Sequence, residues 1–180
     1  MAPSRTRLAC LIVLAVAWAA ASRAEVPCPR CTCVSPQYGT PEEAVVEALY
    51  AAEAVFMGEV IEIRTRSGIE CDRVEGCADP DRDRGVESPW ESVLVGFRVE
   101  SSWKGVGNDE STIAVATHFQ ESACGYFFDV GRRYLVYAYD YDEDGQLTTN
   151  LCARTRPAEV AGFDIGVLSR QVQSFQGAAE

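Results

Sequence analysis

The sequence has very little histidine and far fewer basic than acidic residues. A single histidine, His118, leaves little room for a His-based catalytic centre or a multi-His metal site. Lys and Arg number 16 against 27 Asp and Glu, which gives a net charge of -11. Because nucleic-acid binding needs clustered basic residues, this composition argues against a nucleic-acid partner. No phosphate-binding loop, nucleophile elbow or zinc-binding helix motif occurs either, so we expect no enzymatic activity.

Long apolar runs are also missing, apart from one near the N-terminus. Residues 8–21 are apolar, Arg5 and Arg7 precede them, and small residues follow at Ser22 and Ala24. This pattern predicts a signal peptide over residues 1–24. The alternative, a membrane anchor, is less favoured because a spanning helix needs about 20 apolar residues. We therefore expect a secreted, extracellular protein (periplasmic or on the cell surface in a bacterium) with no membrane span. Cleavage would remove three arginines and no acidic residue, lowering the net charge from -11 to -14.

Cysteine is abundant, with eight residues in the chain. One of them, Cys10, lies in the predicted signal peptide, so seven remain after cleavage. An exported protein meets an oxidising compartment, where disulfides are the default. An odd number leaves one thiol free, paired between chains, or removed by further processing. Cys71 and Cys77 are close in sequence and are candidates for a local disulfide.

The first cysteines of the mature chain allow two further interpretations. Cys28-Pro29-Arg30-Cys31 has the spacing of a redox motif, but such a motif needs a helix N-terminus in a βαβ context, and none is predicted. A metal site made of the thiolates of Cys28, Cys31 and Cys33 is the second interpretation. Disulfide formation competes with it in an oxidising compartment.

The mature chain predicts one helix near each end of a single domain over residues 25–170. The first helix spans 41–52, with Thr40 as N-cap and proline at its first position. The second spans 157–168, although two glycines weaken it. Residues 171–180 are expected to form a disordered tail.

Strands are predicted between the two helices. β-branched or alternating segments indicate strands at residues 54–63, 92–103, 111–117, 133–139 and 146–152. Residues 64–90 predict a long loop between the first two strands. The pattern favours an all-β sandwich or a small closed barrel, of which the five-stranded oligonucleotide/oligosaccharide-binding (OB) barrel is one form.

Two cysteine segments resemble those of a known family. Cys31-Thr32-Cys33-Val34-Ser35-Pro36 is similar to the mature N-terminus of the tissue inhibitors of metalloproteinases. Glu121-Ser122-Ala123-Cys124-Gly125-Tyr126-Phe127 is similar to their second cysteine segment. Weaker similarities are Trp103-Lys104-Gly105 and Thr148-Thr149-Asn150-Leu151-Cys152. In order and rough spacing the chain resembles the N-terminal domain of that family, in the netrin-module superfamily, over about residues 31–170. The resemblance implies a closed five-stranded OB barrel.

The resemblance also implies a disulfide framework and an inhibitory site. By position, Cys31 would pair with Cys124 and Cys33 with Cys152. In the family, the free α-amine and carbonyl oxygen of the first cysteine bind the catalytic zinc of the protease, which has an open coordination position. Here Cys31 would be that zinc ligand, and Thr32 would enter the specificity pocket. The implied inhibitory wedge consists of Cys31, Thr32, Cys33, Val34, Glu121, Ser122, Ala123 and Cys124.

This sequence departs from the family pattern ahead of Cys31. After the predicted cleavage, six residues (EVPCPR) still precede Cys31, so its nitrogen is an amide and not a metal-binding amine. A second cut after Arg30 would free the amine and remove Cys28. The sequence therefore leaves two functions open: an inhibitor-like module that binds a secreted zinc metalloendopeptidase, or a non-inhibitory interaction or structural module that binds another extracellular protein.

One acidic segment resembles the start of a calcium-binding loop. Asp140, Asp142 and Asp144 alternate ahead of Gly145, as carboxylates around one cation do. The twelfth position holds Leu151, where a bidentate glutamate belongs, so an acidic hairpin turn is the favoured interpretation. We expect no intrinsic cofactor: calcium is a weak candidate, and the zinc belongs to the target enzyme.

Overall fold

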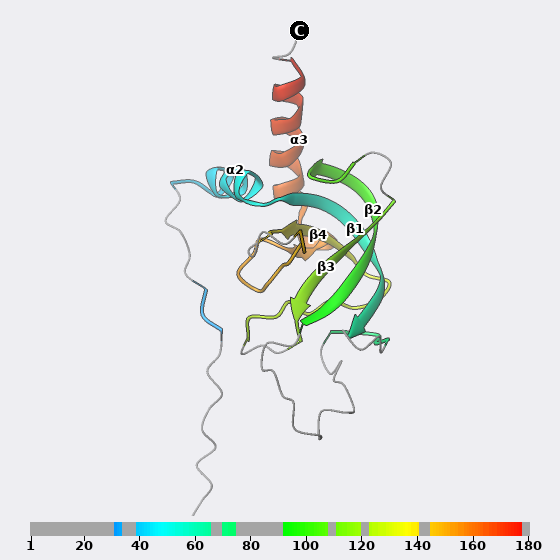
Figure 1. Ribbon diagram of the computed structural model, residues 1–180. Coiled ribbons are helices and arrows are strands. Elements are labelled where there is room, and N and C mark those ends of the chain that lie inside the picture. The colour runs from blue at the N-terminus through cyan, green and yellow to red at the C-terminus, as the bar shows by residue number, and fades with distance from the viewer. Residues whose placement is uncertain are drawn as a thin grey trace, which may run out of the picture.

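The computed structural model describes residues 31–33, 39–65, 70–74, 92–107, 111–119, 123–140 and 145–177. The predicted signal peptide and most of the loop predicted over residues 64–90 lie outside these residues. The elements, in chain order, are α2 (Pro41–Ala51), β1 (Ala54–Thr65), β2 (Ser92–Lys104), β3 (Thr112–His118), β4 (Arg133–Ala138), β5 (Arg156–Pro157), the 3-10 helix η3 (Ala158–Val160) and α3 (Gly162–Gly177) (Figure 1). No helix among them is long and apolar enough to cross a membrane.

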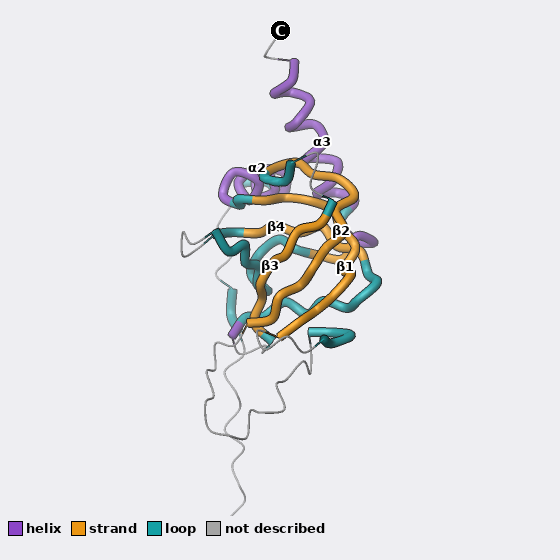
Figure 2. The backbone as a smooth tube through the Cα atoms, turned by 45° about the vertical axis from the view of Figure 1, so that its right-hand side comes forward, coloured by secondary structure: helices purple, strands orange, loops and turns teal. Residues whose placement is uncertain are grey.

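The strands form one antiparallel sheet with the order β3-β2-β1-β4-β5. β1 lies at its centre, with Val60 opposite Phe97 on β2 and Val55 opposite Tyr137 on β4. The β1–β2 register shifts at three places, the last of them between Val60 and Glu62. Such bulges bend a strand and increase its twist, which accounts for the strong curvature of β1 and β2 in Figure 2.

The concave face of the sheet encloses an aromatic core. Phe56, Phe97, Phe128 and Tyr134 are almost completely buried there. Their rings meet edge to face, with centroids 5.4 Å apart for Phe56–Phe97, 5.2 Å for Phe97–Phe128 and 4.8 Å for Phe128–Tyr134. This geometry is favoured for aromatic pairs. Phe128 therefore holds the loop before β4 against the concave face of the sheet.

The two helices cover the opposite face of β1 and β4 and create a second core. Leu49 of α2 and Leu168 of α3 pack there with Val55, Leu135 and Tyr137 of the sheet. Because side chains alternate along a strand, neighbours such as Val55 and Phe56 enter different cores. This two-sided burial explains why β1 is apolar over nearly its whole first half.

The start of α2 follows the sequence prediction. The Thr40 hydroxyl accepts a hydrogen bond of 3.1 Å from the Glu43 amide, and proline occupies the first turn. Lys104 donates to the Tyr50 carbonyl near the other end, at 2.9 Å. The prediction of a helix beginning at Pro41 with Thr40 as N-cap is confirmed.

The prediction of a closed barrel is not supported, because among the described residues the five-stranded sheet is open and β3 and β5 are its edges. Residues 146–152, expected to form a strand, contain only isolated bridges and turns among the described residues. Ala116 of β3 donates to the Leu147 carbonyl and accepts from the Thr149 amide, while Tyr139 and Thr148 exchange both of their backbone hydrogen bonds. The chain then turns away at Asn150, so the pairing ends before a strand forms.

The C-terminal prediction is also corrected. Residues 158–160 form a separate 3-10 helix, and α3 then runs to Gly177, well into the segment expected to be a disordered tail. Tertiary contacts stabilise this helix despite its glycines. Arg170 lies 2.8 Å from Glu42 of α2, and the Trp103 indole donates to Ser169 at 3.4 Å.

Candidate functional site: the disulfide-anchored N-terminal segment

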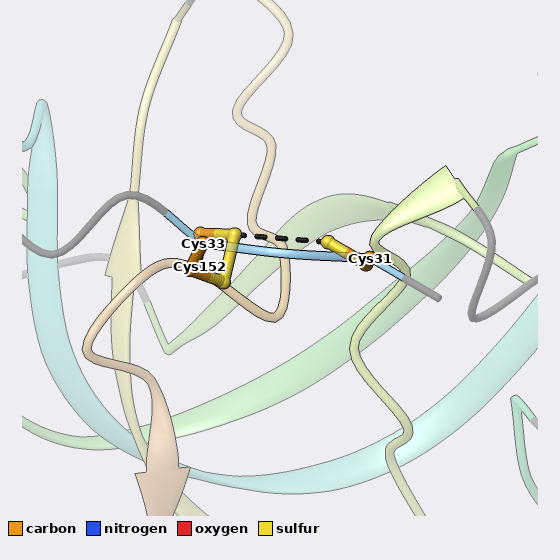
Figure 3. Close-up of side chains that lie close together, drawn as sticks. All are labelled: Cys31, Cys33 and Cys152. Carbon is orange, nitrogen blue, oxygen red and sulfur yellow. Dashed lines mark hydrogen bonds between the residues drawn. A yellow bond between two sulfur atoms is a disulfide. The ribbon is translucent and has the colours of Figure 1, made fainter. Parts of the chain in front are cut away.

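Residues 31–33 are attached to the sheet domain by two disulfides. Cys31 is bonded to Cys124 and Cys33 to Cys152, with Cα–Cα distances of 5.1 and 5.2 Å. These are the two pairs that the family resemblance implies. Sγ of Cys31 lies 3.8 Å from Sγ of Cys152 (Figure 3). Neither sulfur carries a hydrogen, so this is a van der Waals contact that places the two disulfides side by side.

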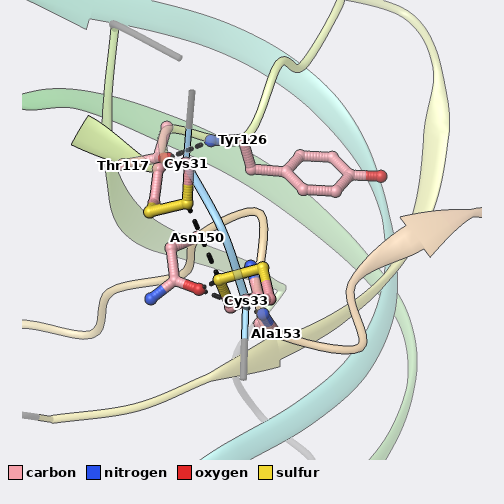
Figure 4. Close-up of a disulfide and its surroundings, with 8 residues drawn as sticks. Cys31, Cys33, Thr117, Tyr126, Asn150 and Ala153 are labelled. Atoms are coloured by element: carbon pink, nitrogen blue, oxygen red, sulfur yellow. Dashed lines mark hydrogen bonds between the residues drawn. A yellow bond between two sulfur atoms is a disulfide. The ribbon is translucent and has the colours of Figure 1, made fainter. Parts of the chain in front are cut away.

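The loop that carries Cys124 is fixed to β3 and to the second cysteine loop. Cys124 has a φ of 59°, the left-handed conformation that non-glycine residues rarely adopt. Its carbonyl accepts from the Leu151 amide at 2.8 Å. Two residues later, the Tyr126 amide donates to the Thr117 hydroxyl at 2.8 Å (Figure 4). Together these bonds fix the direction in which Cys124 meets the N-terminal segment.

The loop that carries Cys152 is a tight polar turn. The Asn150 side-chain oxygen accepts from the amides of Cys152 and Ala153, at 2.9 and 3.0 Å (Figure 4). On either side of this turn, the hydroxyls of Thr149 and Thr155 lie 2.9 Å apart. Thr149 donates to the Tyr137 carbonyl at 2.9 Å, and the Tyr137 amide donates to Thr155 at 3.0 Å. Both ends of the turn are thus fixed to β4.

An ionic cluster joins this loop to α3. Asp164 is completely buried and receives two hydrogen bonds of 3.0 Å from Arg154, one to each carboxylate oxygen. Arg156 approaches to 3.5 Å, and the Tyr137 hydroxyl donates at 3.4 Å. The hydrogen bonds that Arg154 donates to Asp164 raise the pKa of Arg154, while burial and then the charge of Asp164 raise the pKa of Tyr137. We call Asp164, Arg154, Arg156 and Tyr137 the Asp164 cluster.

The Asp164 cluster was not predicted from the sequence. Its only signal is the spacing of Arg154 and Arg156, which places two guanidinium groups on one side of an extended segment. Their partner lies at the start of a helix and has no local sequence pattern. The cluster connects α3 through residues 149–156 to Cys152, and through that cysteine to the N-terminal segment.

The structure brings together only part of the predicted wedge. Thr32 and Cys33 are exposed, while Cys31, Ala123 and Cys124 are half-buried. The remaining predicted wedge residues, Val34, Glu121 and Ser122, lie outside the described residues. The structure therefore shows Thr32 between two disulfide-bonded cysteines, with its side chain accessible to a partner.

The other predicted sites fall partly outside the described residues. Cys71 is disulfide-bonded, and its partner is not among the described residues, which do not include Cys77. Asp140 accepts a hydrogen bond from the Gly145 amide at 2.9 Å, as in a polar turn. Asp142 and Asp144 are not described, so the calcium site stays a prediction.

Three of the cysteines lie as close together as metal ligands. The Sγ atoms of Cys31, Cys33 and Cys152 are all within 4.8 Å of one another. A metal would need thiolates, however, and each of these sulfurs is held in a disulfide. The cluster is therefore a pair of adjacent disulfides.

Removing both disulfides by four cysteine-to-serine substitutions is expected to lower the free energy of unfolding by about 2–3 kcal/mol. The bridges close loops of 93 and 119 residues, and full constraint of the unfolded chain would give about 5 kcal/mol each. We expect a smaller loss of free energy, because the chain connection from Cys33 to Pro41 is short. Even without the bridges, it limits how far the segment can move from the folded domain. Urea unfolding measures the loss.

Removal of either disulfide alone is expected to lower the free energy of unfolding by about 1 kcal/mol or less. The other bridge still holds the segment, at a cysteine two residues from the lost attachment. The pairs Cys31→Ser with Cys124→Ser and Cys33→Ser with Cys152→Ser are the matched variants. A loss near 5 kcal/mol for either pair would show that the segment contributes to the core and is not merely tethered.

Comparison with known proteins gives no independent assignment. A scan against protein-family models and a search of curated proteins both found no match to this chain. The resemblance to metalloproteinase inhibitors therefore rests on the cysteine segments and on the residues quoted for it above.

Proposed function

We propose that this chain is a secreted, non-enzymatic binding module of the metalloproteinase-inhibitor type, whose contact surface is residues 31–33. The observation that carries this proposal is the exposed Thr32 between Cys31 and Cys33, each of them bonded to a different loop of the same sheet domain. The proposed partner is a secreted zinc metalloendopeptidase.

The two disulfides hold residues 31–33 rigidly, and this rigidity favours binding. Cys124 and Cys152 lie in loops that are hydrogen-bonded to each other, to β3 and to β4. A segment held this way loses little conformational entropy when it enters a cleft. The exposed Thr32 and Cys33 are then available to a partner without rearrangement of the domain.

Inhibition through zinc requires a free amine on Cys31. A neutral α-amine and a carbonyl oxygen are suitable zinc ligands, whereas an amide nitrogen is not basic. The sequence offers one route to this amine, cleavage between Arg30 and Cys31 by a trypsin-like protease. The sulfur of Cys31 takes no part, since it is bonded to Cys124.

The test compares two forms of the protein that differ by one residue at the N-terminus. One begins at Cys31, and the other carries a single additional alanine ahead of it. Each is titrated into a panel of zinc endopeptidases, with Arg170→Gln as a control far from Thr32 in sequence and exposed on α3. We expect inhibition by the first form and by its Arg170→Gln variant, and loss of inhibition in the extended form. Equal inhibition with and without the extra alanine would exclude the zinc-chelate mechanism.

A second candidate function is a non-inhibitory module that binds another extracellular protein. The observation that favours it is the sequence EVPCPR, which stands between the predicted signal-peptide cleavage site and Cys31. If the secreted protein keeps these residues, the zinc-chelate mechanism is blocked. N-terminal sequencing of the secreted protein distinguishes the two: a start at Cys31 supports the inhibitor, and a start at Glu25 supports the interaction module.

A further inference from the structure

The two disulfides of the N-terminal segment are close enough to exchange with each other. The Cys31 and Cys152 sulfurs belong to different bridges and are separated by 3.8 Å. Cys33 completes the group of three sulfurs within 4.8 Å, of which Cys124 is not a member. Cys31 and Cys152 are thus the two half-cystines across which the bridges meet (Figure 3).

We propose that the two bridges form a thiol-responsive switch in which the pairs Cys31–Cys124 and Cys33–Cys152 convert to a single Cys31–Cys152 disulfide. This inference is independent of the proposed function, because it uses only the positions of the sulfurs. It assigns to the exposed Cys33 a role in disulfide exchange, in addition to its place in the proposed contact surface.

The exchange begins at the more exposed bridge. Cys33 and Cys152 are both exposed, whereas Cys31 and Cys124 are half-buried. A thiolate from a small external thiol, such as glutathione, attacks the Cys33 sulfur and forms a mixed disulfide with it. The bond to Cys152 breaks, and Cys152 leaves as a thiolate.

The released Cys152 thiolate then attacks its neighbour. It turns about its own side-chain bonds into line with the Cys31–Cys124 bridge and forms a bond to Cys31, while Cys124 leaves as a thiolate. One external thiolate is consumed and one protein thiolate is produced. Two disulfides are replaced by one protein disulfide and one mixed disulfide, so the electrons balance without an oxidant or reductant.

The product differs from the starting state in what the segment is attached to. Cys152 now holds Cys31 in place of Cys33, and the loop of Cys124 is no longer bonded to residues 31–33. Attachment to the turn at Asn150 therefore shifts by two residues, which moves Thr32 relative to both loops. The alternative product, a Cys31–Cys33 bridge, is disfavoured because residues two apart in an extended segment are about 6.6 Å apart, near the upper limit for a disulfide.

Single variants of the full chain test the exchange without an external thiol. Cys33→Ser leaves Cys152 as a thiol beside the Cys31–Cys124 bridge, and Cys124→Ser leaves Cys31 as a thiol beside the Cys33–Cys152 bridge. Each variant is isolated at acidic pH, brought to pH 8.5, quenched by alkylation and mapped by mass spectrometry. Both are expected to lose their original bridge and gain Cys31–Cys152, at a rate that rises about tenfold per pH unit below the thiol pKa.

Cys31→Ser is the matched control, because it removes the sulfur at which the bridges meet. It is expected to retain Cys33–Cys152 with Cys124 alkylated. The wild-type chain exposed to limiting glutathione provides a test that does not depend on folding of the variants. Appearance of Cys31–Cys152 with glutathione on Cys33 supports the switch, and loss of the original bridges without any Cys31–Cys152 overturns it.

Discussion

Replacing Asp164 by alanine is expected to lower the free energy of unfolding by about 3 kcal/mol. The substitution removes the only carboxylate of the Asp164 cluster and leaves Arg154 and Arg156 without their shared partner. Breaking a buried ion pair from one side typically costs about 3–5 kcal/mol. We expect the lower end because the two arginine side chains are 25% and 32% exposed and retain some access to water. Chemical denaturation at neutral pH measures the change.

Two further variants serve as comparisons. The first shows whether the lost charge or the space left by the smaller alanine side chain causes the destabilisation. Asp164→Asn keeps the shape of the side chain and removes its charge, and we expect it to retain most of the destabilisation. Glu42→Gln breaks the exposed ion pair between Glu42 and Arg170, in which the side chains are 53% and 60% exposed, respectively. This substitution is expected to lower the free energy of unfolding by less than about 1 kcal/mol. If Asp164→Asn were as stable as the wild type, the ionic contacts would contribute nothing to stability.

Replacing Gly105 by alanine is expected to cost about 3 kcal/mol or more. Gly105 has a φ of +72°, and a Cβ atom at this position would lie 1.9 Å from the Glu53 carbonyl oxygen. The neighbouring backbone has little freedom to move, because the Glu53 amide is hydrogen-bonded to the Ala138 carbonyl at 2.8 Å. The added methyl group therefore pushes the end of β2 away from the start of β1. Thermal and urea unfolding of the variant measure the loss.

Two other glycines separate the steric clash from the cost of backbone strain. Gly131 has a φ of +79° with open space around its missing side chain, so Gly131→Ala is expected to cost about 1–2 kcal/mol. Gly107 has neither constraint, and alanine there is expected to be nearly neutral. Equal losses at Gly105 and Gly131 would show that the clash with Glu53 is relieved at no cost.

Much of the fold follows from local sequence signals. Thr40 and Pro41 determine the start of α2 because a hydroxyl cap and a proline suit the first turn of any helix. β1 to β4 coincide closely with β-branched and alternating segments, since a strand buried on one or both faces needs such residues. These features depend on neighbours in sequence, so no tertiary information is needed to find them.

The remaining elements depend on contacts between distant residues. Residues 146–152 have strand-like composition, but the Asn150 side chain satisfies two backbone amides and turns the chain. α3 contains glycines that argue against a helix, yet burial of Leu168 and the contacts of Asp164 stabilise it. A buried aspartate at the start of a helix looks, from the sequence alone, like an ordinary exposed first-turn acid.

The candidate site was also predictable only in part. The cysteine positions point to the two bridges through the family resemblance, and the bridges are those that the structure contains. The hydrogen bonds that orient the bridged loops, such as the one from Leu151 to Cys124, are made by backbone groups and have no sequence signature.

The backbone contacts of residues 147–149 have a consequence for how copies of the protein behave toward each other. β3 is an outer strand, and an outer strand with unpaired amides and carbonyls is a template for joining another molecule. Leu147 and Thr149 occupy both hydrogen-bonding groups of Ala116 on that side. This short segment therefore protects β3 against edge-to-edge association at Ala116, a task that the strand predicted over residues 146–152 would otherwise perform.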